Sequence, residues 1–449
     1  MLGLSGCMRV DVNPEPIFEQ VKEGVANPTD KEIYWAVSVK DCVEVVSVNE
    51  LLQKDFSEEM VVRIALLNNQ SLQALYEDLG IAKASHAQAK FLKNPIFTLA
   101  YQFSTQSAVS DLINFGLLEN FLEIFLLPMK NRVATAELAE IKCRLVTNVL
   151  DVVGETTIAF YALQKAMRIC ELKKQVLLAN ELSYEAAQRL FIAGNLRDLE
   201  VSLEKSFYEQ SKLEVASWEI KVLKKREELN VLMGLRGEQI DWKITSEIPE
   251  LIEEENAFET IENDAILNSI DLKVAYNNLI ATAISFGIDT TKLVFPLLEM
   301  GAAIHREESV WYVGPAINLA IPLFDVDKAN SKRAESVIMK EWKQYTTLAT
   351  EIRSKARRAR FSLLNNLKQS QYFKNVILPL SKEITHLVHM QNNAMQIGVF
   401  RLLAAKKREL EHQIQSIQMQ TEYRISKVIL ETLLRGHVLG KDVLQKREK

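Results

Sequence analysis

Apolar residues recur every three or four positions from Met129 to Ile248, a stretch without proline, and this period predicts long helices. Gly194-Asn195 interrupts the stretch near its middle, so the two arms are expected to form a helical hairpin over about residues 131–234. At about 1.5 Å per residue, the first arm would be about 95 Å long, and such an apolar stripe requires partner helices. Gly234 is expected to end the second arm. The stripe of the first arm contains Leu138, Ile141, Leu145, Val149, Val152, Ala159, Leu163, Ala166 and Cys170, and that of the second contains Leu199, Leu203, Phe207, Leu213, Ala216, Ile220 and Leu223.

The period changes to two ahead of this hairpin, which predicts strands. Alternation from Phe97 to Phe103 predicts a first strand, and Ile113 to Leu127 is a second candidate that Pro128 ends. The second candidate alternates poorly because apolar residues crowd both faces of its later half, so a buried helical segment is the alternative there. Together the two strands form a predicted β-hairpin over about residues 95–127. A helical pattern from Ser57 to Leu92 precedes it.

The chain then repeats this order of elements, which indicates an internal duplication. The second copy predicts a β-hairpin over about residues 295–324 and a long helical hairpin over about residues 328–434. Gly398 is the expected counterpart of Gly194 at the tip, and Pro379, which has no counterpart, should kink the second hairpin. The positions Ala65, Leu66, Leu67, Asn68, Leu72, Tyr76 and Leu79 recur 200 residues later as Ala265, Ile266, Leu267, Asn268, Leu272, Tyr276 and Leu279.

Composition limits the class of protein further. With 449 residues, of which 48% are hydrophobic and 25% charged, the chain can bury a large core, and a net charge of -5 does not indicate a nucleic-acid binder. The sequence has no run of 18 apolar residues, which argues against a membrane-spanning helix. Four strands cannot close a barrel alone, and open strand edges are costly, so other copies of the chain are expected to complete the sheet. Three copies would supply about twelve strands, within the range of transmembrane barrels.

Catalytic motifs are absent, so neither an enzyme nor a cofactor is expected. His386 and His389 lie three positions apart on one predicted helix and could hold a metal ion, but without a third ligand nearby a solvated helix face is favoured. Arg353, Arg357 and Arg360 share a helix face that could meet nucleic acid. Because no aromatic residues interleave with them, a solvated face or ion pairs between subunits are favoured instead.

The four residues Leu4-Ser5-Gly6-Cys7 fit the lipobox of bacterial lipoproteins, in which Cys7 would carry the lipid. A chance match is the alternative, because the apolar segment before it comprises only Met1 to Leu4. Cys143 and Cys170 are interpreted as inert small residues. The patterns divide the chain into residues 1–7, the remnant of a lipoprotein signal; 8–56, an extended leader and equatorial segment; 57–235, the first repeat; 236–256, an acidic connector; 257–436, the second repeat; and 437–449, a C-terminal tail.

From about Asn49 to Gly436 the sequence resembles the TolC-type outer-membrane efflux proteins. The order, spacing and duplication of three segments carry the resemblance: Ala65 to Leu79 with its run into Asn94-Pro95, Gly314-Pro315 through Asp325, and Ala193-Gly194-Asn195. The resemblance implies a mainly α protein with a small β part. It would be a homotrimer with a twelve-strand β-barrel in the outer membrane, continued by an α-helical barrel in the periplasm.

The resemblance also implies the function and the partners. The protein would be a passive exit duct for substrates that an inner-membrane transporter delivers through a periplasmic adaptor protein. It would lie among the outer-membrane lipids of a Gram-negative bacterium, extend into the periplasm and be lipid-anchored through Cys7, since many relatives are lipoproteins. The substrate specificity would lie in the transporter. A soluble coiled-coil scaffold is the alternative, although it leaves the paired strands unexplained.

The two predicted hairpin tips are the candidate docking sites for the adaptor. Each tip combines a glycine at the reversal with apolar residues at a position where polar turn residues would cost nothing. The alternative is that the tips only close the hairpins. The candidate residues are Gly194, Asn195 and Leu196 at the first tip and Gly398, Val399 and Phe400 at the second.

Overall fold

The computed structural model describes residues 12–29, 33–35, 51–52, 56–103, 111–244, 260–294, 298–307, 310–320 and 328–440. The chain forms two compact units: unit 1 comprises Met1–Glu23, Leu75–Val146 and Ile270–Thr350, and unit 2 comprises Gly24–Ala74, Thr147–Ser269 and Glu351–Lys449. The lipobox cysteine Cys7, most of the acidic connector and the last nine residues lie outside the described residues. Among the described helices, none has a stretch apolar and long enough to span a lipid bilayer.

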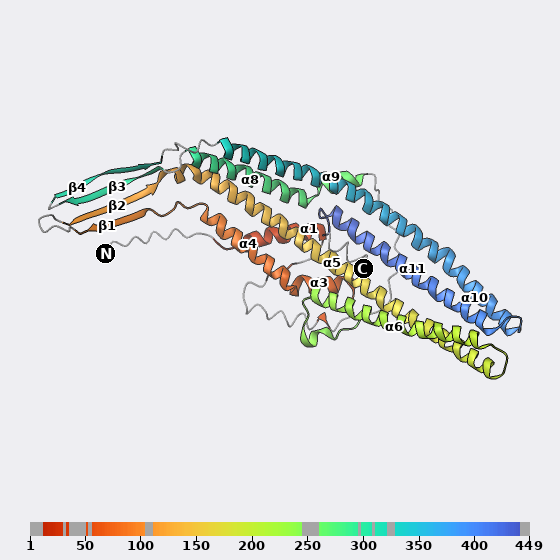
Figure 1. Ribbon diagram of the computed structural model, residues 1–449. Helices are drawn as coiled ribbons and strands as arrows, with labels where there is room; N and C mark the ends of the chain where they lie inside the picture. Colours follow the sequence, from red (N-terminus) through yellow and green to blue (C-terminus); the bar gives the residue numbers. More distant parts are fainter. Residues whose placement is uncertain are drawn as a thin grey trace. The chain divides into compact units, whose positions relative to one another are not determined.

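Unit 1 contains a four-stranded antiparallel sheet in the order β1-β2-β3-β4 (Figure 1). The two predicted β-hairpins join into one sheet because β2 pairs with β3, and this leaves β1 and β4 at the edges. The strands are β1 (Ile96–Gln102), β2 (Leu112–Asn120), β3 (Leu298–Glu307) and β4 (Val310–Leu319).

The second strand is shorter than the sequence predicts. Residues 121–127 were expected to extend the strand but form the first turns of helix α5 (Phe121–Ile192), as in the helical alternative. The Asn120 side chain accepts a hydrogen bond from the Leu122 backbone N–H at 3.1 Å, which favours a helix start at this position. Leu122 and Leu126 then pack against Ile288, so an inward helical face replaces the strand period. Pro128 lies inside α5, past its first turn, and does not end a strand.

An amphipathic helix, α1 (Glu15–Thr29), occupies part of the segment that the sequence predicts to be an extended leader. That expectation was wrong because Pro14 and Pro16 suggested irregular backbone, whereas a proline in the first turn of a helix is tolerated. The buried face of α1 includes Phe18, whose ring lies 5.1 Å from the buried ring of Tyr76, edge to face. Tyr76 belongs to α4 (Gln70–Gln88). Helices α8 (Ile270–Val294) and α9 (Lys328–Tyr372) also contribute to unit 1.

Unit 2 has a core in which α3 (Glu58–Asn68) packs against α5 and the end of α6 (Asp198–Leu232). The Ser57 hydroxyl caps α3 by accepting a hydrogen bond from the Met60 backbone N–H. Tyr161 of α5 donates a hydrogen bond of 2.5 Å to Glu58 of α3. Burial and this hydrogen bond raise the pKa of Tyr161 to about 12, so its hydroxyl stays protonated and remains a donor.

The core of unit 2 includes a tryptophan from the predicted acidic connector. Trp242 stacks on Phe56 at 4.8 Å, lies under the Arg226 guanidinium and donates a hydrogen bond of 2.8 Å to Asn230. The first residues of the connector therefore belong to this core, whereas its acidic run, Glu247 to Glu255, lies outside the described residues. The short helix η2 (Gly237–Ile240) leads the chain back to this position.

The remaining helices of unit 2 belong to the second repeat: α7 (Ile261–Leu267), the part of α9 from Glu351 onward, α10 (Leu378–Asn393) and α11 (Val399–Leu434). Leu410 and Ile414 of α11 pack against Ile169 of α5, so the two helical hairpins share a core. A π-helical segment, η4 (Phe373–Ile377), lies directly before Pro379. Proline and π-helical turns both disturb helix geometry, so the irregularity lies where the sequence predicts a kink.

Both repeats break their first helix at equivalent residues, where the sequence predicts a continuous helix. Asn69 separates α3 from α4, and the chain separates α7 from α8 at the matching position. The Asn68 amide donates hydrogen bonds to the carbonyls of Met233 and Gly234 at the end of its own helical hairpin. The Asn268 amide likewise donates to the Leu434 carbonyl. The predicted duplication is thus visible in tertiary hydrogen bonds.

The described part of the C-terminal tail is packed. Leu439 is buried against Gly154 of α5, where a Cβ atom would lie 2.6 Å from its side chain. His437 forms an ion pair of 2.9 Å with Asp151 of the same helix if it is protonated. Residues 437–440 therefore belong to unit 2.

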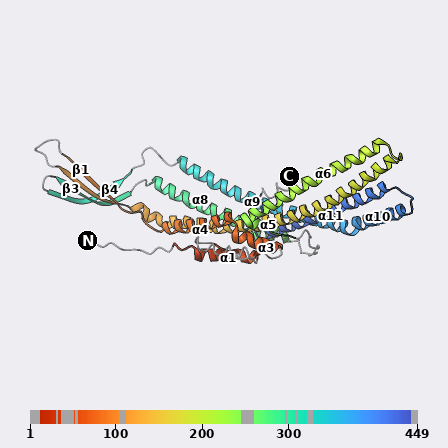
Figure 2. The same cartoon turned by 90° about the horizontal axis from the view of Figure 1, so that it is seen from below.

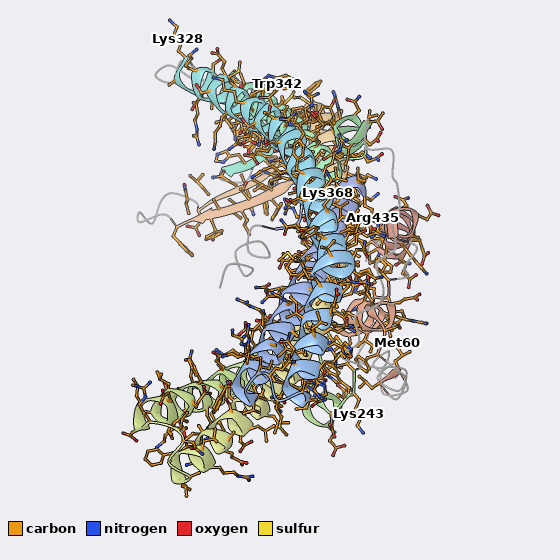
Figure 3. The ribbon with its side chains drawn as sticks, turned by 90° about the vertical axis from the view of Figure 1, so that its right-hand side faces the viewer. Met60, Lys243, Lys328, Trp342, Lys368 and Arg435 are labelled. Atoms are coloured by element: carbon orange, nitrogen blue, oxygen red, sulfur yellow. The ribbon has the colours of Figure 1, made fainter. Side chains whose placement is uncertain are left out.

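Replacing Trp242 with alanine should destabilise unit 2 by about 3 to 5 kcal/mol, because it removes a large buried ring and leaves Asn230 without its donor. The measurement is the thermal unfolding midpoint, followed by helical circular dichroism. Trp342→Ala is the matched control, since that ring is 49% exposed on α9 (Figure 3) and should cost about 0.5 kcal/mol or less. Equal midpoints for the two variants would contradict the assignment of Trp242 to the core.

Candidate functional site

The two faces of the sheet differ in chemistry. Residues directly opposite each other in an antiparallel pair point to the same face, so the register defines each face. One face, termed the apolar face, carries a continuous surface of large apolar side chains, and Arg306, Glu119 and Tyr101 are its only polar members among the described residues. The apolar members of this face are Phe97, Leu99, Ile113, Phe115, Leu117, Leu298, Met300, Ala302, Ile304, Trp311, Val313, Pro315, Ile317 and Leu319.

No described side chain of the four strands is buried, although many are large and apolar. Val313 is 72% exposed and Phe97 is 63% exposed. Phe97, Phe115 and Trp311 form an aromatic row across the sheet, with neighbouring ring centroids 6.3 and 6.2 Å apart. An exposed apolar patch of this kind marks a surface that meets protein or lipid.

The opposite face, termed the polar face, carries mainly small and polar side chains, and its large aliphatic residues, Ile96, Leu112, Leu118 and Val310, lie toward the strand ends. The Asn114 amide oxygen contacts the His305 ring across β2 and β3, and Asn318 donates to Glu299 at 3.2 Å across β3 and β4. Thr98 donates to the Gly116 carbonyl at 3.4 Å. A sheet with one apolar face and one polar face is suited to separate an apolar medium from water.

Both edges of the sheet are open in the described chain. β1 pairs only with β2, and β4 pairs only with β3. Open edges present rows of backbone donors and acceptors that can pair with another strand.

The two helical stripes predicted from the sequence have different environments in the structure. The stripe of α5 is covered: Val149 and Leu163 are almost completely buried, and Ile141 and Val152 are half-buried. The stripe of α6 is exposed, with Leu213 at 74%. The inward face of α6 is mixed: Val215 and Leu229 are buried there beside polar residues, and Glu214 pairs with Lys173 of α5 at 2.7 Å. A further exposed stripe on α9, η4 and α10 contains Phe361, Tyr372, Val376, Leu380, Ile384 and Leu387.

The two hairpin tips lie at the same end of unit 2 in both views (Figures 1 and 2). At the first tip, Gly194 has φ of +76°, a left-handed conformation that glycine adopts at little cost. Its N–H donates to the Phe191 carbonyl, and the Asn195 N–H donates to the Leu190 carbonyl, both at 2.9 Å. These two bonds form a Schellman motif that ends α5.

The second tip uses a different residue from the one predicted. Met395, with φ of +58°, takes the left-handed position, and its N–H donates to the Asn392 carbonyl at 2.9 Å, as Gly194 does to Phe191. Gly398 has φ of -76° and precedes α11 as its N-cap, the place that Arg197 has before α6. The expected equivalence of Gly194 and Gly398 was therefore wrong. The sequence interpretation placed the left-handed residue at the glycine nearest the tip, but in the second hairpin that residue lies three positions earlier.

The exposure of apolar side chains at the tips also differs from the expectation. Leu196 and Phe400 are half-buried, and Val399 is 37% exposed. The most exposed apolar side chains are Met395 at 93% and Ile192 at 84%, which the sequence analysis did not single out. The helix period could have predicted that Ile192 is exposed, since this residue lies off the buried stripe of α5.

Comparison with known proteins identifies the fold. No family model matches the sequence, and no curated protein matches it. A membrane protein from Pseudomonas aeruginosa superposes with a TM-score of 0.71 at 18% identity, over 84% of this chain and 92% of that one. The MtrE outer-membrane channel of Neisseria gonorrhoeae gives 0.67 at 18% identity, over 84% and 89%. The CmeC outer-membrane channel of Campylobacter jejuni gives 0.65 at 16% identity, over 95% and 94%.

The chain has the TolC-type fold. The solved structures similar to it include channels rather than enzymes. A mostly helical chain with one small antiparallel sheet agrees with that fold. The expected TolC-type resemblance is thus confirmed at the level of the fold.

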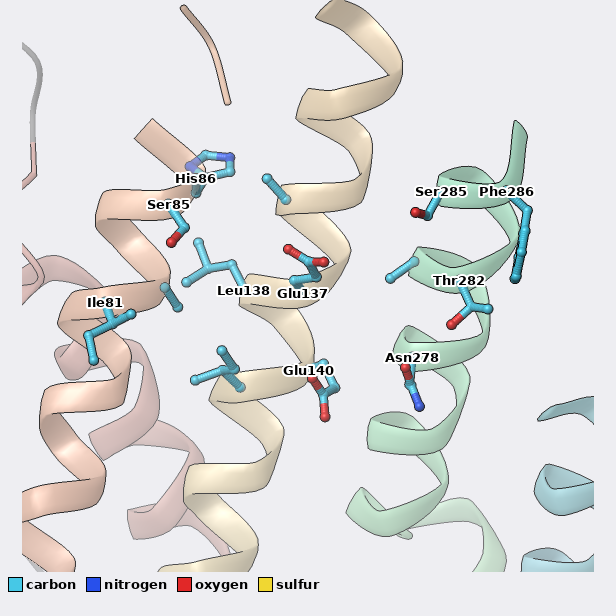
Figure 4. Close-up of a pocket in the computed structure, with 14 residues that line it drawn as sticks. Ile81, Ser85, His86, Glu137, Leu138, Glu140, Asn278, Thr282, Ser285 and Phe286 are labelled. Carbon is cyan, nitrogen blue, oxygen red and sulfur yellow. The ribbon is translucent and has the colours of Figure 1, made fainter. Parts of the chain in front are cut away.

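A groove of about 440 Å³ lies between α4, α5 and α8 in this TolC-type chain (Figure 4). His86, Glu137, Glu140 and Asn278 are among the polar residues that line it. Burial, together with the nearby charges of Lys90, Lys83 and Lys142, lowers the pKa of His86, so the ring is neutral near pH 7. Among the described residues, no three histidine, cysteine or acidic side chains lie close enough together to hold one metal ion, in this groove or around His386 and His389, which are both exposed.

Replacing Gly194 with alanine should cost about 1 to 2 kcal/mol locally, because a residue with Cβ is strained at positive φ. Gly398→Ala is the matched control and should cost less, about 0.5 kcal/mol, since its φ is negative, a Cβ atom there meets open space and only the weaker N-cap preference of alanine remains. Amide hydrogen exchange of the two tips measures the difference. Faster exchange in Gly398→Ala than in Gly194→Ala would contradict the assignment of Met395 to the second reversal.

Proposed function

We propose that the protein is an outer-membrane channel that serves as the exit duct of a tripartite efflux or secretion system. The observation that carries the proposal is the sheet: it has an exposed apolar face, a polar opposite face and two open edges. Such a sheet becomes stable when lipid covers the apolar face, water covers the polar face and other strands pair with both edges. The TolC-type fold and the channel proteins that share it support the same assignment.

The channel is a homotrimer. Four strands from each of three copies make a barrel of about twelve strands in which β1 of one copy pairs with β4 of the next, and no edge remains. The exposed apolar stripes on α6 and on α9, η4 and α10 support this assembly, because neighbouring copies can cover them with knobs-into-holes packing. The helices then continue the barrel into the periplasm.

The duct is passive, and its partners are a periplasmic adaptor protein and an inner-membrane transporter. The tips carry the adaptor contact, through Gly194, Asn195 and Leu196 of the first hairpin and Gly398, Val399 and Phe400 of the second. The support is that both tips lie at one end of unit 2 and that apolar side chains are exposed there, Met395 and Ile192 most of all. A lipid on Cys7 anchors the chain to the membrane, and metabolic labelling with a fatty acid tests this anchor.

The mass of the purified protein tests the proposal directly. Extraction should require detergent, and the measured mass should correspond to about three chains. A monodisperse monomer that is soluble without detergent would overturn the channel and would favour a coiled-coil scaffold.

An arginine on the apolar face should impair membrane insertion in a manner that depends on depth. Val313→Arg, near the middle of β4, should cost roughly 2 to 4 kcal/mol, whereas Leu319→Arg, at the last residue of the strand, should cost about 1 kcal/mol or less. Tyr312→Arg on the polar face is the matched control and should insert like the parent. The measurement is the fraction of folded trimer in lipid vesicles as urea is increased. If Tyr312→Arg were the most damaging of the three, the faces would be assigned in reverse.

Replacing Leu196 and Phe400 together with serine should weaken crosslinking to the adaptor and reduce efflux, while the trimer and its insertion stay intact. The physical reason is that docking of helical hairpins is driven by apolar contacts at the tips. Ile81→Ser with Leu267→Ser is the control, because both side chains are apolar and exposed and neither is at a tip. A double tip variant that pumps and crosslinks like the parent would show that the tips are only turns.

A further inference from the structure

Each strand of the sheet has one end near the helices of unit 1, and lysines gather beside these ends. Lys93 lies just before β1, and Lys292 lies in the last turn of α8 before β3. Lys130 lies in the first part of α5, the helix that follows β2. The three lysines come from separate parts of the sequence, and the fold brings them together.

The contacts around Glu123 show the convergence. The Glu123 side chain is 7% exposed and forms ion pairs with Lys130 and with Lys93, the latter at 3.4 Å. In the part of the chain that the structure describes, Lys292 has no carboxylate within 4.0 Å. Lys292 lies one turn after Ile288, which packs against Leu122 and Leu126 of α5, so the end of α8 lies beside the start of α5. Burial, and then the charges of Lys292 and Lys93, lower the pKa of Lys130. Three lysines against the buried Glu123 and the exposed Asp289 of α8 leave an excess of positive charge.

A lysine in the last turn of a helix complements the helix dipole, and this accounts for Lys292 considered alone. It does not account for the position of Lys292 beside two lysines that already share one buried carboxylate. Bringing a third positive charge to such a place raises the electrostatic energy of the isolated chain. An anionic group from outside the chain would lower it.

Exposed apolar side chains lie beside the lysines and form a collar at the same end of the sheet. Phe125 is 71% exposed, Leu92 is 44%, Ile124 is 39% and Phe121 is 37%. Leu92 is adjacent to Lys93 in the sequence, and Ile124 and Phe125 directly follow Glu123. An apolar and aromatic collar next to ammonium groups suits the boundary between acyl chains and headgroups, where lysine stems run along apolar surface and the charge reaches the polar layer.

We propose that Lys93, Lys130 and Lys292 bind the phosphate of an anionic phospholipid headgroup on the periplasmic side of the membrane, with the apolar collar among its acyl chains. This inference rests on the proposed function, because the helix-proximal end of the sheet faces the periplasm only in a membrane-inserted channel. A phosphate with one further negative or neutral headgroup matches the excess positive charge, whereas a headgroup with its own ammonium group meets repulsion.

The experiment is native mass spectrometry of the detergent-purified full-length protein with phosphatidylglycerol, phosphatidylcholine or inorganic phosphate added in parallel. The parent should bind phosphatidylglycerol more tightly than phosphatidylcholine. In the variant Lys130→Gln with Lys292→Gln, the affinity for phosphatidylglycerol should fall roughly fivefold for each lysine removed, which corresponds to about 1 kcal/mol apiece. The affinity for phosphatidylcholine should not change.

Two further variants separate charge from structure. Lys130→Arg keeps the charge and should keep the lipid affinity, whereas Lys205→Gln with Lys224→Gln removes two exposed charges from α6 and should leave it unchanged. Unchanged phosphatidylglycerol binding in the variant Lys130→Gln with Lys292→Gln would overturn the inference. A parent that binds inorganic phosphate but shows no preference for phosphatidylglycerol would also overturn it. Failure of the proposed function would be seen separately, as a parent that forms no trimer or does not float with vesicles.

Discussion

A four-stranded sheet with two open edges and two uncovered faces is the constraint on which the rest of the structure depends. Unpaired backbone groups at an edge and a continuous apolar face are both unfavourable in water, and no described segment of the chain covers either. Closure with further strands and immersion of one face in lipid remove both costs together. The duplication serves this end, because the pairing of β2 with β3 makes one sheet from the two repeats and leaves a single edge on each side for a neighbouring copy.

The same heptad-like signal has two structural outcomes in this chain. The stripe of α5 is buried by α3 and α11 of the same chain, whereas the stripe of α6 is exposed. Apolar spacing predicts that a helix needs a partner, but it does not specify whether the partner belongs to the same polypeptide. The structure of one chain shows which stripe is covered by its own helices and which stripe is left exposed. The exposed stripes thereby become an argument for assembly that the sequence alone cannot supply.

Long periodic segments were predictable from the sequence, and local exceptions were not. The strand periods, the second helical hairpin from Lys328 to Leu434 and the duplication follow from spacing that tertiary contacts reinforce. The break at Asn69 could not be predicted, because it depends on an amide of Asn68 that reaches a helix end distant in sequence. Trp242 was missed for a similar reason, since its partners Phe56 and Asn230 lie outside its acidic surroundings. The tip residues could be located, but their backbone roles required φ angles, and their docking role and lipidation at Cys7 stay predictions.

The left-handed methionine at the second tip has a consequence for symmetry. In the proposed trimer, the duplicated chains would approach sixfold symmetry along the helices, since each repeat contributes one hairpin. At the tips this approximation fails: one hairpin reverses through Gly194, which has no side chain, and the other through Met395, whose side chain is almost completely exposed. A ring of six identical partner subunits would therefore meet two alternating kinds of surface. The binding energy would differ between neighbouring subunits of the partner. The partner ring and the ring of hairpin tips would therefore share threefold, not sixfold, symmetry.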